Sequence, residues 1–142
     1  MTKFIKTVFL LILILGIQKG YSQVYKFQTT GFSVLEKNSK GKWGKWSDLK
    51  MTSVIISLDT NKNRIIVYSQ EMQLYQILNY EELQENDNDE IYTFSCQDVD
   101  GEPFTISIIT RKKQANRKQL YINQKDVIIA YNIINLIDDG KK

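Results

Sequence analysis

Apolar and polar residues alternate along most of this chain in short runs that end at polar turns. Over residues 53–110 the runs read V-I-I-S-L, R-I-I-V-Y, L-Y-Q-I-L, I-Y-T-F-S and F-T-I-S-I-I. A period of two over roughly four to eight residues is typical of strands with one buried face. The pattern predicts an all-β fold, an antiparallel meander of about eight strands that forms a small barrel or sandwich.

Strands are also expected on both sides of this region. Gly31 allows a bend or bulge, so the N-terminal stretch is either two short strands or one bent strand. In residues 72–80 two candidate faces are interrupted, by Gln76 and by Ile77, and the pattern leaves open which face is buried. The strands expected before residue 127 are 24–30, 32–36, 53–58, 64–69, 72–80, 91–97, 103–110 and 119–123.

The run V-I-I-A-Y-N-I-I-N-L-I at residues 127–137 suits two kinds of element. Val127, Ala130, Tyr131 and Ile134 would line one face of a helix. However, six of the eleven residues are β-branched, which favours a strand buried on both faces. We expect a strand here, with a helix as the alternative.

The first residues have the layout of a secretory signal peptide. Lys3 and Lys6 precede an apolar block at 8–15, which is shorter than the roughly 20 residues that span a bilayer. Small Gly20 and Ser22 then occupy the positions that a signal peptidase requires. We therefore expect a cleaved signal peptide.

Cleavage before Gln23 would divide the chain into a signal peptide, 1–22, and a single β-domain, 23–142. The domain would be secreted or periplasmic and soluble, with no stable membrane insertion. Removing the three leader lysines leaves 16 of the 19 basic residues against 16 acidic ones. A net charge near zero gives no electrostatic reason to expect nucleic acid as a partner.

The sequence contains no histidine and one cysteine, Cys96. Ser–His and Cys–His nucleophile pairs and histidine-based metal sites are therefore ruled out. One cysteine cannot close an internal disulfide, and we expect Cys96 to be a buried free thiol in a strand. We expect no enzyme activity and no cofactor, the alternative being an enzyme that works with carboxylates.

The segment N-S-K-G-K-W-G-K-W-S-D-L-K at residues 38–50 is the most distinctive in the chain. Trp43 and Trp46 are large amphipathic rings three residues apart beside flexible glycines. They are candidate contacts for an unknown protein, a glycan or a small apolar ligand. The alternative is that one or both rings close an end of the barrel or sandwich.

Two loops carry most of the clustered charge. The basic segment R-K-K-Q-A-N-R-K is a candidate anion-binding site, the alternative being an exposed hairpin tip. Its five cations are Arg111, Lys112, Lys113, Arg117 and Lys118. The acidic loop at 81–90 lacks the glycine and the bidentate glutamate of a calcium loop, so we expect no metal site. If sequential strands pair, both loops and the 59–63 turn fall at one end of the sheet, where opposite charges would screen each other.

The export signal, the segment K-G-K-W-G-K-W-S-D and the hairpin N-K-N-R-I-I-V-Y resemble those of small uncharacterised secreted β-proteins of Bacteroidetes-type bacteria. This resemblance implies export from a bacterial cell and a lone β-domain, with no activity or site residue to transfer. The meander also resembles a lipocalin-like barrel, without the G-x-W of lipocalins at its first strand.

We therefore expect an exported, non-enzymatic binding or interaction domain of unknown ligand. The alternatives are a structural envelope protein and an enzyme that uses carboxylates. The barrel interior distinguishes these hypotheses, because a cavity of several hundred Å³ lined by aromatic residues would suit an apolar ligand and a filled core would not.

Overall fold

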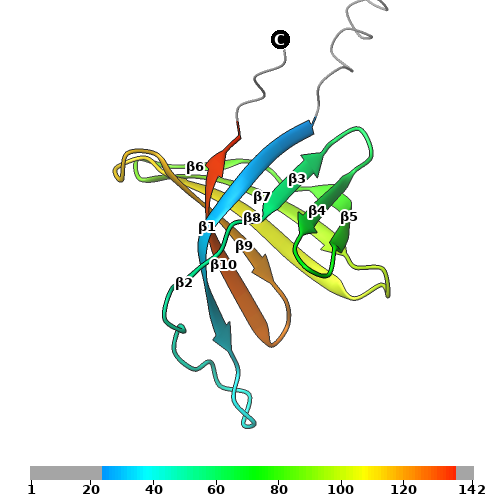
Figure 1. Cartoon of the computed structure of the whole chain (residues 1–142), viewed down its shortest axis with the longest axis vertical. Helices are drawn as coiled ribbons and strands as arrows, with labels where there is room; N and C mark the ends of the chain where they lie inside the picture. Colours follow the sequence, from blue (N-terminus) through cyan, green and yellow to red (C-terminus); the bar gives the residue numbers. More distant parts are fainter. Residues whose placement is uncertain (1–23, 137–142) are drawn as a thin grey trace, which may run out of the picture.

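The computed structural model describes residues 24–136, and the predicted signal peptide lies outside this range. Within it the protein is all-β and forms one antiparallel sheet of ten strands (Figure 1). The strands are β1 (Val24–Glu36), β2 (Lys50–Met51), β3 (Ile55–Asp59), β4 (Arg64–Tyr68), β5 (Gln73–Tyr80), β6 (Gln84–Glu85), β7 (Asp89–Gln97), β8 (Pro103–Arg111), β9 (Arg117–Asn123) and β10 (Val127–Asn135).

The sheet closes on itself because its first and last long strands pair. β1 is hydrogen-bonded to β3 on one side and to β10 on the other, so that β1, β3, β4, β5, β7, β8, β9 and β10 form an eight-stranded barrel. The short strands β2 and β6 are additions to β1 and β7. The predicted all-β meander is confirmed, and the structure is a barrel rather than a sandwich. β10 also confirms that the ambiguous C-terminal run is a strand.

β1 is one bent strand, as one of the two sequence interpretations predicted. Its register against β10 shifts between Thr29 and Gly31, which marks a bulge. At Gly31 an added Cβ would lie 3.0 Å from Leu49 Cδ1 and 3.1 Å from the Lys50 carbonyl oxygen. The missing side chain thus lets the segment that contains β2 approach β1 closely.

A second bulge resolves which face of β5 is buried. The register of β5 against β7 advances by one extra residue between Ile77 and Asn79, and Leu78 is 60% exposed. The bulge reverses the alternation, so that Tyr75 and Ile77 before it and Tyr80 after it all face the barrel interior. Simple period-two counting fails at this point because the strand itself is irregular.

The pairing register arranges the interior side chains of β7 to β10 in cross-strand rows. The outermost row carries polar side chains on β7, β8 and β9 and an apolar one on β10, and the deeper rows are apolar. From the open end inward, the rows are Glu90, Thr110, Lys118 and Ile133; then Tyr92, Ile108, Leu120 and Tyr131; then Phe94, Ile106, Ile122 and Ile129.

The two ends of the barrel differ. We call the end where β3, β5 and β8 finish the mouth, and the opposite end the base. Near the base, Tyr75 and Phe104 pack with ring centroids 5.0 Å apart, and Phe32 and Tyr131 with centroids 6.0 Å apart. All four rings belong to the main core or pack against it, so side chains fill the base.

The core should tolerate truncation poorly at its centre. Ile106 is fully buried, and Ile106→Ala should lower the free energy of unfolding by about 2–5 kcal/mol because it leaves a cavity. Leu78→Ala, at the exposed bulge, is the matched control and should change stability by less than about 0.5 kcal/mol. Urea unfolding curves of both variants measure this difference. An equal loss of unfolding free energy in the two variants would contradict the assignment of Ile106 to the interior and Leu78 to the outside.

Cys96 should be chemically inert in the folded protein. Its side chain is buried as a free thiol, as predicted, and burial raises its pKa from 9.0 to about 12. The thiol therefore stays protonated at pH 8–9, where an unfolded cysteine forms thiolate, and stability linked to it is lost as pH rises from about 9 toward 12. Iodoacetamide should label Cys96 at pH 8 in urea but not in buffer; rapid labelling in buffer would contradict the burial.

Candidate functional site

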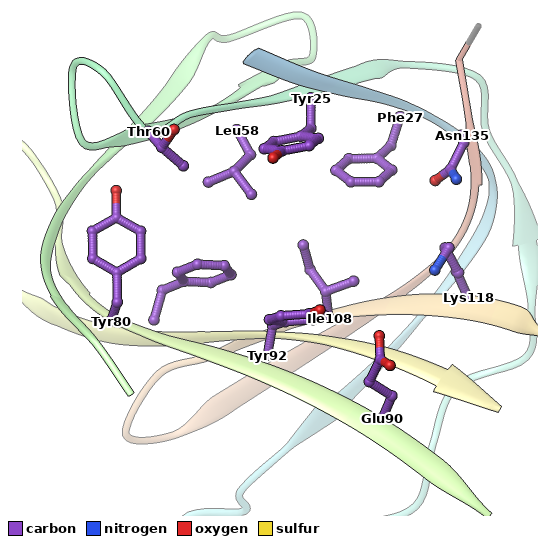
Figure 2. Close-up of a pocket in the computed structure, with 11 residues that line it drawn as sticks. Tyr25, Phe27, Leu58, Thr60, Tyr80, Glu90, Tyr92, Ile108, Lys118 and Asn135 are labelled. Carbon is purple, nitrogen blue, oxygen red and sulfur yellow. The ribbon is translucent and has the colours of Figure 1, made fainter. Parts of the chain in front are cut away.

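The barrel interior contains a cavity of about 410 Å³ at the mouth (Figure 2). This volume falls within the range of roughly 300–1,000 Å³ that is usual for small-molecule sites. Seven of the eight barrel strands contribute to its walls, together with Thr60 of the turn after β3. The lining residues are Tyr25, Phe27, Leu58, Thr60, Tyr80, Glu90, Tyr92, Phe94, Ile108, Lys118 and Asn135.

Five aromatic rings form most of the apolar wall. In Figure 2, Tyr25 and Phe27 of β1 point into the cavity from one side, and Tyr92 of β7 points into it from the other. Deeper in the barrel, Phe94 packs edge-to-face against Tyr80 with ring centroids 5.6 Å apart. The rings near the mouth combine a large apolar surface with a phenol hydroxyl, a combination common in ligand sites.

Polar groups are concentrated at the outer edge of the cavity. Lys118 Nζ donates a hydrogen bond to Thr110 Oγ1 at 2.7 Å. The Tyr80 hydroxyl donates to Asn63 Oδ1 at 2.7 Å. Partial burial, followed by the charge of Glu90 and a hydrogen bond with it, raises the pKa of Tyr92. The Tyr92 phenol is therefore a neutral donor near pH 7, and among residues 24–136 one carboxylate and one ammonium group line the cavity.

The carboxylates that line the cavity bear on the alternative of an enzyme that works with carboxylates. A carboxylate-dependent hydrolase needs two acids that converge on the substrate, and Glu90 is the one carboxylate that lines this cavity within residues 24–136. In the same range, no three His, Cys, Asp or Glu side chains gather in a way that could hold a metal ion.

The five cations of the basic segment separate in the structure. The Arg111 side chain forms an ion pair with Asp89 at 3.2 Å, and Lys112 with Glu85 at 2.6 Å. These pairs agree with the predicted proximity of the acidic and basic loops at one end. Lys113 is exposed at the hairpin tip, Arg117 lies on the outer face of the barrel, and Lys118 faces the cavity. The five residues therefore do not converge on one anion site.

Trp43 and Trp46 belong to the segment between β1 and β2, and this segment lies near the base and outside the barrel (Figure 1). Their exposed fractions are 42% and 45%, and neither ring belongs to the core that fills the base. Lys37 Nζ lies 5.0 Å from the centroid of the Trp43 ring. The predicted alternative, in which these rings close an end of the barrel, is therefore wrong.

A second, smaller hollow of about 290 Å³ lies on the outer face of the barrel beside Trp46. The Trp46 ring meets Tyr121 edge-to-face at 6.2 Å, and Asn132 accepts hydrogen bonds from Arg117 and Gln119, both at 3.2 Å. Trp46 therefore contributes to a concave surface, and Trp43 does not line it.

The comparisons with known proteins do not extend this picture. No protein-family model, curated protein or solved structure matches the chain. The resemblance to exported proteins of Bacteroidetes-type bacteria stays a prediction. Residues 24–136 contain no helix with the length and hydropathy needed to span a membrane.

Sequence reasoning missed most of the cavity residues. It predicted the strand at 91–97 but did not link Tyr92 of that strand to Tyr25 or Tyr80, which lie in distant parts of the chain. It named Lys118 as one of a cluster of loop cations. The signal that could have identified Lys118 is its position two residues before buried Leu120, on the same face of the strand. Using this signal requires knowing that the strand begins before Lys118.

The two tryptophans should contribute modestly to stability. We expect Trp43→Ala and Trp46→Ala each to lower the free energy of unfolding by about 1 kcal/mol, the scale of an exposed cation–π or aromatic pair. Phe94→Ala, a buried control, should cost about 3–5 kcal/mol. Thermal unfolding followed by circular dichroism ranks the three, and a loss at either tryptophan as large as that at Phe94 would contradict their placement outside the core.

Proposed function

We propose that the protein is an exported, non-enzymatic binding domain that holds a small, largely apolar ligand inside its barrel. The observation that carries this proposal is the 410 Å³ cavity, walled by five aromatic rings and reached from the mouth. Export itself rests on the predicted signal peptide.

The contrast between the two ends of the barrel supports a ligand site. The base is filled by packed aromatic and aliphatic side chains, whereas the mouth keeps Tyr25, Tyr80 and Tyr92 each more than 40% exposed. Covering these rings with a ligand would remove apolar surface from water, at roughly 25 cal/mol per Å². A structural envelope protein, the alternative, has no need of such a cavity.

The closed barrel also lowers the cost of binding. The cavity walls are strands held by hydrogen bonds on both sides, so few groups lose freedom when a ligand enters. Apolar cavities with a few placed polar groups, largely formed before the ligand arrives, are the usual form of small-molecule sites.

A second contact at the outer hollow is supported by Trp46. Its half-exposed ring lies beside the amides of Gln119 and Asn132 and the guanidinium group of Arg117. An aromatic face next to hydrogen-bonding groups suits a glycan or a polar surface of a partner protein. Loss of such a contact in Trp46→Ala but not in Trp43→Ala would separate this role from that of the cavity.

Filling the cavity should abolish binding. Ile108 lines the cavity, and its neighbour Ile109 points to the outer face of the same strand. The neutral fluorescent probe phenylnaphthylamine should bind the unmodified protein and Ile109→Trp, and should bind Ile108→Trp at least about tenfold more weakly because the indole occupies its space.

Fluorescence titration at equal protein concentration measures the effect, with thermal unfolding as the check that both variants are folded. Leu58→Trp fills the cavity from the opposite wall and replaces Ile108→Trp if that variant does not fold. Equal binding by the inward and outward variants would contradict the cavity as the site, and no binding by the unmodified protein would contradict the proposed function for ligands of this class.

A further inference from the structure

The geometry of the mouth points to the chemical class of the ligand: we infer that it is an amphipathic monocarboxylate whose acid group binds Lys118. This inference rests on the proposed function, because it describes the head group of the molecule that occupies the cavity.

Among residues 24–136, Lys118 is the one basic residue that lines the cavity. Its side chain is half-buried, and its inward position on β9 follows from the register that pairs it with Thr110 of β8 and Ile133 of β10. Its ammonium group donates to Thr110 Oγ1, and Thr110 is itself only 8% exposed. This hydrogen bond fixes the charge at the outer edge of the apolar wall.

Within the part of the chain that the structure describes, Lys118 lacks the carboxylate partner that Arg111 and Lys112 have. Arg111 pairs with Asp89 and Lys112 with Glu85, whereas no carboxylate in residues 24–136 lies within 4.0 Å of Lys118 Nζ. An ammonium group has three donors, and one neutral hydroxyl uses one of them. A ligand carboxylate would supply both the counter-charge and a charge-assisted hydrogen bond.

Glu90 does not take this role within the protein. It occupies the same cross-strand row as Lys118 but on the far side of Thr110. Two strand spacings put the two backbones about 10 Å apart. Its charge helps to raise the pKa of the neighbouring Tyr92 hydroxyl, whereas no carboxylate in residues 24–136 forms an ion pair with Lys118.

The ligand's apolar part would extend from Lys118 into the barrel. Directly below the polar row, Tyr92 and Ile108 occupy the next row, and Phe27 faces them across the cavity. A chain that begins at Lys118 and runs inward therefore passes between aromatic and aliphatic walls (Figure 2). The observed order, with polar Glu90, Thr110 and Lys118 outside and apolar rows inside, matches an acid head with a hydrocarbon tail.

Three probes of equal chain length separate the head-group chemistry: dodecanoic acid, dodecanol and dodecylamine. We expect the unmodified protein to bind the acid most tightly at pH 8, measured by displacement of phenylnaphthylamine. Lys118→Met keeps the length and apolar stem of the side chain, and should weaken binding of the acid about tenfold while leaving the alcohol unchanged.

Two further variants test whether the effect depends on the position and on the sign of the charge. Lys113→Met removes an exposed lysine from the same hairpin and should leave the affinities for all three probes unchanged. Glu90→Gln removes a negative charge from the mouth, so it should strengthen acid binding by a small factor and not affect the alcohol. A loss of packing would not weaken acid binding in Lys118→Met and also strengthen it in Glu90→Gln.

Equal affinities of the unmodified protein for acid and alcohol would overturn the inference and leave the proposed function intact. An equal loss of affinity for all three probes in Lys118→Met would also overturn the inference. So would tighter binding of the amine than of the acid, if Glu90→Gln removed that difference. If none of the three probes displaced phenylnaphthylamine, the inference would fail, and if phenylnaphthylamine itself did not bind, the proposed function would fail with it.

Discussion

The pairing of β1 with β10 is the constraint on which the rest of the structure depends. Nine residue pairs between Phe27 and Glu36 of β1 and Val127 and Asn135 of β10 join the two ends of the described chain and close the sheet. Closure removes both exposed long edges, which would otherwise be sites for association with other chains. It also makes every inward-facing side chain face a single interior, so that core and cavity are continuous.

The division of that interior into a filled base and an open mouth follows from strand irregularity as well as from residue type. The bulge at Leu78 returns Tyr80 to the interior, and the bulge near Gly31 bends β1. Beyond the bulges, the register sets polar Glu90, Thr110 and Lys118 above the apolar rows. Water therefore reaches a charged edge first and aromatic walls below it, which is the order that an amphipathic ligand requires.

Cations that are close in sequence at the mouth lie on opposite sides of the barrel wall. Arg111 and Lys118 belong to one basic segment, yet the first forms an ion pair on the outer face and the second faces the cavity. Alternate residues of a strand point to opposite sides, so a run of cations across a hairpin is divided by the barrel wall. The functional unit is instead a row assembled across β7, β8 and β9, which no local segment contains.

The sequence by itself determined the all-β class, the succession of strands, the burial of Cys96 and the gathering of opposite charges at one end, because period-two alternation and turn residues are local signals. Tertiary structure alone decided between barrel and sandwich, the buried face of β5, the exterior position of Trp43 and Trp46, and the cavity. The physical reason is that these features depend on register and closure. Tyr25, Tyr80 and Tyr92 share one cavity because hydrogen bonds wrap distant strands around it, and alternation within any one strand carries no information about which other strand it will face.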